Sequence, residues 1–141
     1  MKYYVLLIIC MILSGCSDKK HRDDFIGIWR ADNGSEIILY KDSTCVLKEL
    51  DLRVVNPRIY DEVLNVKGTW MFKKTDELGY KVDNIFISSK DLTFTITFDI
   101  WGHGILENKR PWYLFLYIGA PDAMDKFKFT KVSDECGSVS D

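Results

Sequence analysis

From residue 25 to residue 132 the chain consists of short apolar or alternating segments separated by turn residues. This pattern is typical of β-strands joined by tight turns. Eight consecutive strands with short links favour an all-β fold, an eight-stranded antiparallel up-and-down barrel, because closure removes exposed strand edges. A sandwich of similar strand count is the alternative. The predicted strands cover residues 25–31, 35–40, 44–50, 66–72, 80–88, 92–99, 112–118 and 126–132.

The clearest alternation lies between Leu92 and Asp99, where apolar residues and threonines follow each other with a period of two. A strand with one buried and one solvated face has this period. The next residues, 100–110, contain His103 between two glycines and are expected to form a loop.

Two predicted strands carry a Gly-x-Trp triplet, Gly27-Ile28-Trp29 on the first and Gly68-Thr69-Trp70 on the fourth. This pairing resembles small bacterial lipocalin-like lipoproteins, in which the first tryptophan closes one end of the barrel. In lipocalins an arginine of the last strand stacks on that tryptophan. The last predicted strand has no arginine, so Lys128 or Lys131 is expected to substitute for it.

The N-terminus has a different pattern. Lys2 precedes the ten-residue apolar run Tyr4–Leu13, which leads into Leu13-Ser14-Gly15-Cys16. A basic start, a short apolar core and small residues at the cleavage site predict an export signal. The run is too short for a membrane-spanning helix, which needs roughly 20 apolar residues.

The end of this signal resembles the lipobox of bacterial lipoproteins, in which the cysteine is acylated and becomes the new N-terminus. The resemblance implies a signal peptide over residues 1–15 and fatty acyl chains such as palmitate on Cys16. Cys16 would then anchor the protein to a membrane of the bacterial envelope. In such lipoproteins an aspartate directly after the cysteine favours the inner membrane. Ser17 at this position favours the outer membrane, with the protein facing the periplasm.

The mature chain is expected to comprise a lipidated cysteine with a polar, solvated tether (16–24), a barrel domain (25–132) and a polar tail (133–141). With the tether at the bottom of the barrel, strand alternation places the links 41–43, 73–79 and 100–111 at the same end. The links 32–34, 51–65, 89–90 and 119–125 fall at the top. The bottom is expected to face the membrane because the tether is short.

Charge excludes one class of partner. The chain has 19 Lys and Arg against 21 Asp and Glu, and a net charge of −2. Nucleic-acid binding needs clustered basic residues, which this interspersed pattern does not provide. We therefore expect no nucleic-acid partner.

The sequence contains no nucleophile motif, phosphate loop or zinc-type spacing, so we expect no enzyme activity, no cofactor and no metal site. Two interpretations of His103 are open: it is either a general base on a mobile loop or a surface histidine. Cys45 and Cys136 are both expected at the bottom, in a compartment that permits disulfides. They form either a bridge or two free thiols.

The seventh predicted strand is apolar on both faces. The phase Trp112, Leu114, Leu116, Ile118 is assigned to the core, which places Tyr113, Phe115 and Tyr117 on the outer wall. Tyrosines are enriched at interfaces. The wall is therefore a candidate partner surface, unless the 100–111 loop or the tail covers it. A second candidate is the top rim, with Asn33, Arg58, Tyr60 and Pro121.

These features favour a lipid-anchored envelope protein with a non-catalytic binding or interaction domain. Large inward side chains favour a filled interior and hence a protein partner, whose identity the sequence does not reveal. One specific alternative is an immunity-type lipoprotein that blocks a toxin in the periplasm. Another is a lipocalin-like carrier of a small apolar ligand, which needs a hollow barrel.

Overall fold

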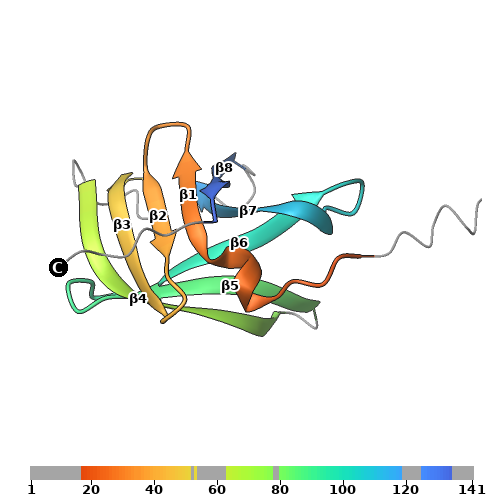
Figure 1. Ribbon diagram of the computed structural model, residues 1–141, viewed down its shortest axis with the longest axis horizontal. Helices are drawn as coiled ribbons and strands as arrows, with labels where there is room; N and C mark the ends of the chain where they lie inside the picture. Colours follow the sequence, from red (N-terminus) through yellow and green to blue (C-terminus); the bar gives the residue numbers. More distant parts are fainter. Residues whose placement is uncertain (1–16, 52, 54–62, 78–79, 119–124, 135–141) are drawn as a thin grey trace, which may run out of the picture.

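A computed structural model describes residues 17–51, 53, 63–77, 80–118 and 125–134, which form a closed barrel (Figure 1). Each strand pairs antiparallel with the next, and β8 pairs with β1. The predicted all-β, eight-stranded up-and-down fold is confirmed, and it fits a lipocalin-like barrel. The elements in chain order are η1 (Arg22–Phe25, a 3-10 helix), β1 (Gly27–Ala31), β2 (Glu36–Leu39), β3 (Thr44–Asp51), β4 (Val63–Glu77), β5 (Tyr80–Ser88), β6 (Ile96–His103), β7 (Lys109–Ile118) and β8 (Asp125–Ser133).

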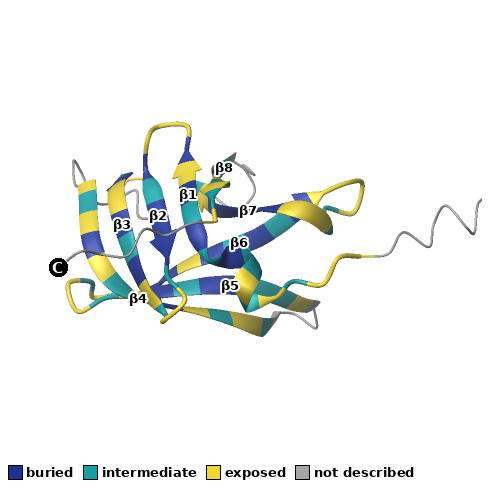
Figure 2. Ribbon diagram, in the orientation of Figure 1, coloured by how far each residue is buried: buried dark blue, intermediate teal, exposed yellow. Residues whose placement is uncertain are grey.

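Alternate side chains of the strands point into the barrel and form one apolar core. Burial alternates residue by residue along β1 and β6 (Figure 2), as a pleated strand with one buried face requires. On β7 the core contains Trp112, Leu114 and Leu116, which belong to the phase predicted to face inward. Burial of each large side chain contributes roughly 1.5–3 kcal/mol. The bulkiest core members are Phe25, Trp29, Trp70, Phe98, Trp112 and Phe129.

The helix η1 covers one end of the barrel, which we call the closed end. Phe25 is completely buried and stacks on Trp29 and Phe72, with ring centroids 6.1 and 5.3 Å apart. Trp29 Nε1 donates a hydrogen bond of 2.8 Å to the Phe25 carbonyl oxygen. The Arg22 guanidinium lies 4.4 Å from the centroid of the Trp70 ring. Both tryptophans of the Gly-x-Trp triplets therefore support η1.

The glycines of these triplets are needed where a neighbouring strand comes close. A Cβ atom on Gly27 would lie 2.2 Å from the carbonyl oxygen of Ser133 in β8, and one on Gly68 would lie 2.4 Å from that of Ser88 in β5. Gly27 also has φ of +134°, which side-chain-bearing residues rarely adopt. Each glycine thus permits a close strand contact, and the tryptophan two residues later enters the core.

The bounds of strands β6 and β7 differ from those predicted from the sequence. β6 begins at Ile96 rather than Leu92 and continues to His103, and β7 begins at Lys109. The predicted loop 100–110 is therefore reduced to 104–108. Gly102 lies within β6, where only a glycine fits because a Cβ there would be 2.2 Å from the Lys109 carbonyl oxygen. Leu92 precedes the strand but still packs against the core. The alternation of apolar residues and threonines before Ile96 therefore reflects burial rather than strand pairing.

The hairpin of β4 and β5 is also longer than predicted. Residues Lys73 to Glu77, expected to be a polar link, continue β4 and pair with residues Tyr80 to Asn84 of β5. Lys73 and Lys74 are both exposed, so successive side chains of this extension meet solvent. A paired segment with two solvated faces lacks the alternation by which strands are recognised.

Among the described residues, no helix is long and apolar enough to cross a membrane.

Candidate functional site

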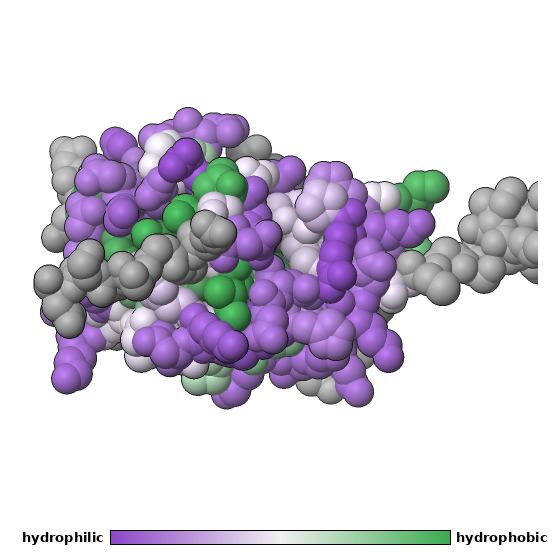
Figure 3. Space-filling view, viewed as in Figure 1, coloured by the Kyte–Doolittle hydropathy of each residue, from purple (hydrophilic) through white to green (hydrophobic). Residues whose placement is uncertain are grey.

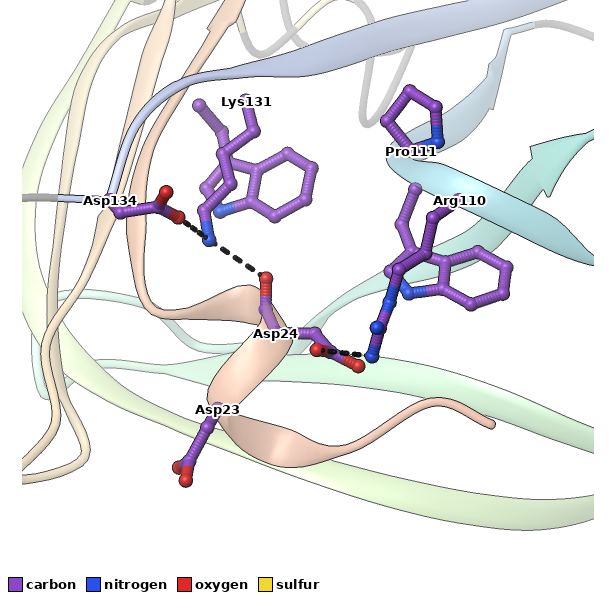
Figure 4. Close-up of a pocket in the computed structure, with 8 residues that line it drawn as sticks. Asp23, Asp24, Arg110, Pro111, Lys131 and Asp134 are labelled. Carbon is purple, nitrogen blue, oxygen red and sulfur yellow. Dashed lines mark hydrogen bonds and ion pairs between the residues drawn. The ribbon is translucent and has the colours of Figure 1, made fainter. Parts of the chain in front are cut away.

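A polar network joins η1 to the last two strands at the closed end (Figure 4). The Asp24 carboxylate accepts a hydrogen bond of 2.7 Å from Arg110 of β7 and one of 2.9 Å from the His21 backbone N–H. Burial raises the pKa of Asp24, but these two hydrogen bonds outweigh burial, and the net pKa lies below its ordinary value. Asp24 is therefore ionised at neutral pH and fixes η1 against β7.

Lys131 of β8 occupies the place expected for the missing arginine. Its Nζ donates a hydrogen bond of 2.9 Å to the Asp24 carbonyl oxygen and lies 5.8 Å from the centroid of Trp29. It also forms an ion pair with Asp134. Lys128, the other candidate, instead lies on the outer wall over Tyr113. Of the two lysines, Lys131 thus links the last strand to η1.

The network borders a groove of about 530 Å³ at the closed end. Figure 4 shows Arg110 and Lys131 directed toward Asp24, whereas Asp23 points away from them. Trp112 also lines the groove, and its buried Nε1–H has no acceptor among the described residues. A water molecule or a ligand is needed to satisfy such a donor.

The N-terminal segment 17–20 is hydrogen-bonded to the barrel, although residues 17–19 are exposed to solvent, as predicted for the tether. Asp18 N donates to the Asn108 carbonyl oxygen at 3.0 Å, and Arg110 N donates to the Asp18 carboxylate at 2.9 Å. Lys20 pairs with Asp83 at 3.3 Å, and both side chains are less than one fifth exposed. The chain therefore enters the barrel beside the turn between β6 and β7. His21, the next residue after this segment, is exposed.

The outer face of β6, β7 and β8 carries a row of aromatic and lysine side chains, which we call the β6–β8 wall. Phe115 lies edge-on to Trp101 and Tyr117, with centroids 5.0 and 5.2 Å apart. Lys126 Nζ lies 3.1 Å from the centroid of Trp101 and 4.9 Å from that of Phe115. Such cation–π contacts hold the ammonium group against the rings. The wall comprises Trp101, Tyr113, Phe115, Tyr117, Lys126 and Lys128.

The three predicted wall residues differ in how much surface they offer. Phe115 is completely buried and Tyr113 is 9% exposed, whereas Tyr117 is 43% exposed. Burial raises the pKa of Tyr113 and Tyr117, and nearby acidic groups raise it further. Both hydroxyls are therefore protonated at neutral pH. The accessible part of the wall consists of the exposed Tyr117 and Lys128, together with Trp101 and Lys126, which are partly buried.

Cys45 has no disulfide partner among the described residues, and its side chain is buried in the core. Burial raises its pKa to about 12, although a hydrogen bond with the Gly68 backbone opposes the shift. A thiol with such a pKa is inert at neutral pH, because the thiolate is the reactive form. Its predicted partner Cys136 lies outside the described residues, so the bridge stays a prediction.

His103 is exposed on the last residue of β6, and its Nδ1 lies 2.7 Å from the Pro111 carbonyl oxygen. A carbonyl oxygen accepts, so Nδ1 carries the proton and donates. Its ring also lies edge-on to Tyr113, with centroids 6.0 Å apart. The described part of the chain contains no group of three His, Cys, Asp or Glu side chains that could hold a metal ion.

Several predicted residues lie outside the described residues: Cys16 and the signal peptide, Cys136, and Arg58, Tyr60 and Pro121 of the top rim. Conversely, sequence analysis missed Trp101 and Lys126 as members of the wall. For Lys126 the signal is the period of two, since Lys126 and Lys128 alternate with phenylalanines on β8. Comparison of the chain with models of known families, with curated proteins and with solved structures finds no match.

Proposed function

We propose that this chain is a lipid-anchored protein of the bacterial cell envelope whose barrel is a non-catalytic domain that binds a protein partner. The observation that carries the proposal is the interior of the barrel. Inward side chains from all eight strands and Phe25 of η1 make one core cluster, with three tryptophans in it. A barrel of eight strands is just wide enough to be filled by side chains. Recognition is therefore assigned to the outer surface.

The anchoring part of the proposal rests on the signal sequence and on where the chain enters the barrel. The lipobox-like Leu13-Ser14-Gly15-Cys16 precedes the first described residue, Ser17. Asp18 is bonded to Asn108 at the closed end. A lipid on Cys16 would hold this end toward the membrane. The outer wall and the opposite end would then face the periplasm.

The β6–β8 wall is the surface we assign to the partner. Tyr117 supplies exposed aromatic area with a polar hydroxyl, the combination that is enriched at protein interfaces. Lys126 and Lys128 are already oriented by aromatic rings, so less side-chain entropy is lost on binding. The chemistry of the wall fits a partner surface that combines apolar and acidic groups.

The test is affinity capture of the lipidated, tagged protein from envelope extracts of its own host. We expect a partner in stoichiometric amount with the native protein and with Lys90→Glu, which reverses an exposed charge on the link between β5 and β6. Capture should fail with Tyr117→Ser and with the pair Lys126→Glu and Lys128→Glu. Circular dichroism of each variant verifies that the barrel is intact.

Three outcomes would contradict the proposal. One is the absence of any partner with the native protein. Another is a partner that all wall variants retain. The third is a small apolar molecule that co-purifies with the barrel in a one-to-one ratio, which would favour the carrier alternative. A toxin as the captured partner would identify the protein as an immunity-type lipoprotein.

A further inference from the structure

The turn between β6 and β7 places two aliphatic side chains in full contact with solvent. Ile105 and Leu106 are 102% and 73% exposed, respectively. Gly102 N donates to the Glu107 carbonyl oxygen at 2.7 Å, and Glu107 N donates to that of Gly104 at 3.0 Å, so the turn is hydrogen-bonded. Turn positions favour Gly, Pro, Asn, Asp and Ser. Backbone geometry therefore does not explain two large apolar residues at this tip.

The tip lies beside the point where the N-terminal segment reaches the barrel. Asp18 N is bonded to the carbonyl oxygen of Asn108, two residues after Leu106. Figure 1 shows the β6–β7 hairpin and the start of the described chain at the same end of the molecule. In Figure 3 an apolar cluster projects from this hairpin at that end. The tip and the N-terminal segment thus face the same environment.

We propose that Ile105 and Leu106 insert into the lipid bilayer to which Cys16 is anchored, as a second membrane contact of the barrel. This inference rests on the proposed lipidation of Cys16. Two residues of extended chain span at most about 7 Å, so a lipid on Cys16 brings Asp18 and its partner Asn108 to the bilayer surface. Apolar side chains at this level enter the boundary between headgroups and acyl chains.

Charges near the tip determine which lipids it prefers. Around the tip, the exposed Lys19, Lys81 and Lys109 are largely offset by Asp18 and Glu107, and Lys20 is paired with Asp83. Attraction to anionic lipid is therefore weak, and burial of apolar area carries the contact. Insertion consequently occurs in zwitterionic bilayers and does not require acidic lipids. Together, the lipid and the tip fix the tilt of the barrel and leave the β6–β8 wall in a defined orientation.

The experiment uses the mature, lipidated protein with Cys136→Ser, labelled at Leu106→Cys with an environment-sensitive fluorophore. Native Cys45 is buried and does not compete for the label. The control carries the label at Asp32→Cys, an exposed residue between β1 and β2. Both proteins are reconstituted into phosphatidylcholine vesicles that contain a nitroxide-labelled lipid. We expect several-fold stronger quenching, and a blue-shifted emission, at position 106 than at position 32.

A second pair of variants tests the native tip, because the label itself replaces Leu106. The label is placed at Lys109→Cys, with the tip either native or changed by Ile105→Ser and Leu106→Ser. Quenching at position 109 should fall several-fold in the doubly substituted protein. Equal quenching of the two proteins would overturn the inference.

Mass spectrometry of the same samples distinguishes failure of the proposed lipidation of Cys16 from failure of the proposed insertion of the tip. A chain without lipid on Cys16 contradicts the proposed anchoring and overturns the docking with it. A lipidated chain whose label at position 106 is quenched no more than the label at position 32 overturns the docking alone.

Discussion

Substitution of Lys131 by methionine removes the link between β8 and η1 while the length of the side chain is retained. The hydrogen bond from the Lys131 ammonium to the Asp24 carbonyl oxygen is charged, and such bonds contribute about 1.5–3 kcal/mol. Its contact with Trp29 adds about 0.5–1 kcal/mol. The ion pair with Asp134 adds little, because the Asp134 side chain is 87% exposed.

We therefore expect Lys131→Met to lower the free energy of unfolding by about 2–4 kcal/mol, which corresponds to roughly 6–20 °C in Tm for a domain of this size. The measurement is urea-induced unfolding of the barrel without its signal and lipid, followed by tryptophan fluorescence. Lys131→Arg keeps the cation and the donor and should retain most of the stability.

The matched control is Lys73→Met, which replaces an exposed lysine of β4 and should change the free energy of unfolding by less than about 0.5 kcal/mol. If Lys131→Met unfolds at the same urea concentration as this control, Lys131 does not hold η1. The assignment of Lys131 as the substitute for an arginine would then be wrong.

Gly27→Ala should lower the free energy of unfolding by about 3 kcal/mol or more, because its Cβ would meet the Ser133 carbonyl oxygen; an unchanged urea midpoint would refute this. Cys45 should resist Ellman's reagent at pH 8 while folded and react after unfolding, whereas a bridge to Cys136 would leave no titratable thiol without reductant. The folded pKa of Asp24 is depressed, so its stabilisation is present above the unfolded pKa and is lost as pH falls through the folded value. Asp24→Asn should therefore destabilise by about 1 kcal/mol at pH 7 and by less at pH 3, and an equal loss at both pH values would contradict this.

The hydrophobic pattern was sufficient to predict the barrel because its signal is local. In strand β7, Leu114 and Leu116 alternate with Phe115 and Tyr117, and the choice of the aliphatic phase for the core was correct. The extent of β6 was not predictable in the same way. The sequence around Gly102 predicts a loop, whereas in the structure its missing Cβ permits a close contact with Lys109 of the neighbouring strand, which the local pattern does not reveal.

The closed end shows a second limit of sequence analysis. The polar residues from Asp18 to Asp24 have the composition of a solvated linker, but their partners Asn108, Arg110 and Lys131 lie far along the chain. Only the closed barrel brings these groups together. Burial of Phe115 on the outer wall has the same origin, because Trp101 and Lys126 come from two neighbouring strands.

We propose above all that a lipid on Cys16 anchors the closed end of this barrel to the membrane. The most direct test is intact-mass and N-terminal analysis of the native protein extracted from membranes of its host. We predict a mature chain that begins at Cys16 and carries a diacylglycerol, with Cys16→Ser abolishing the modification. A mature chain that begins elsewhere, or an unmodified Cys16, would contradict the claim.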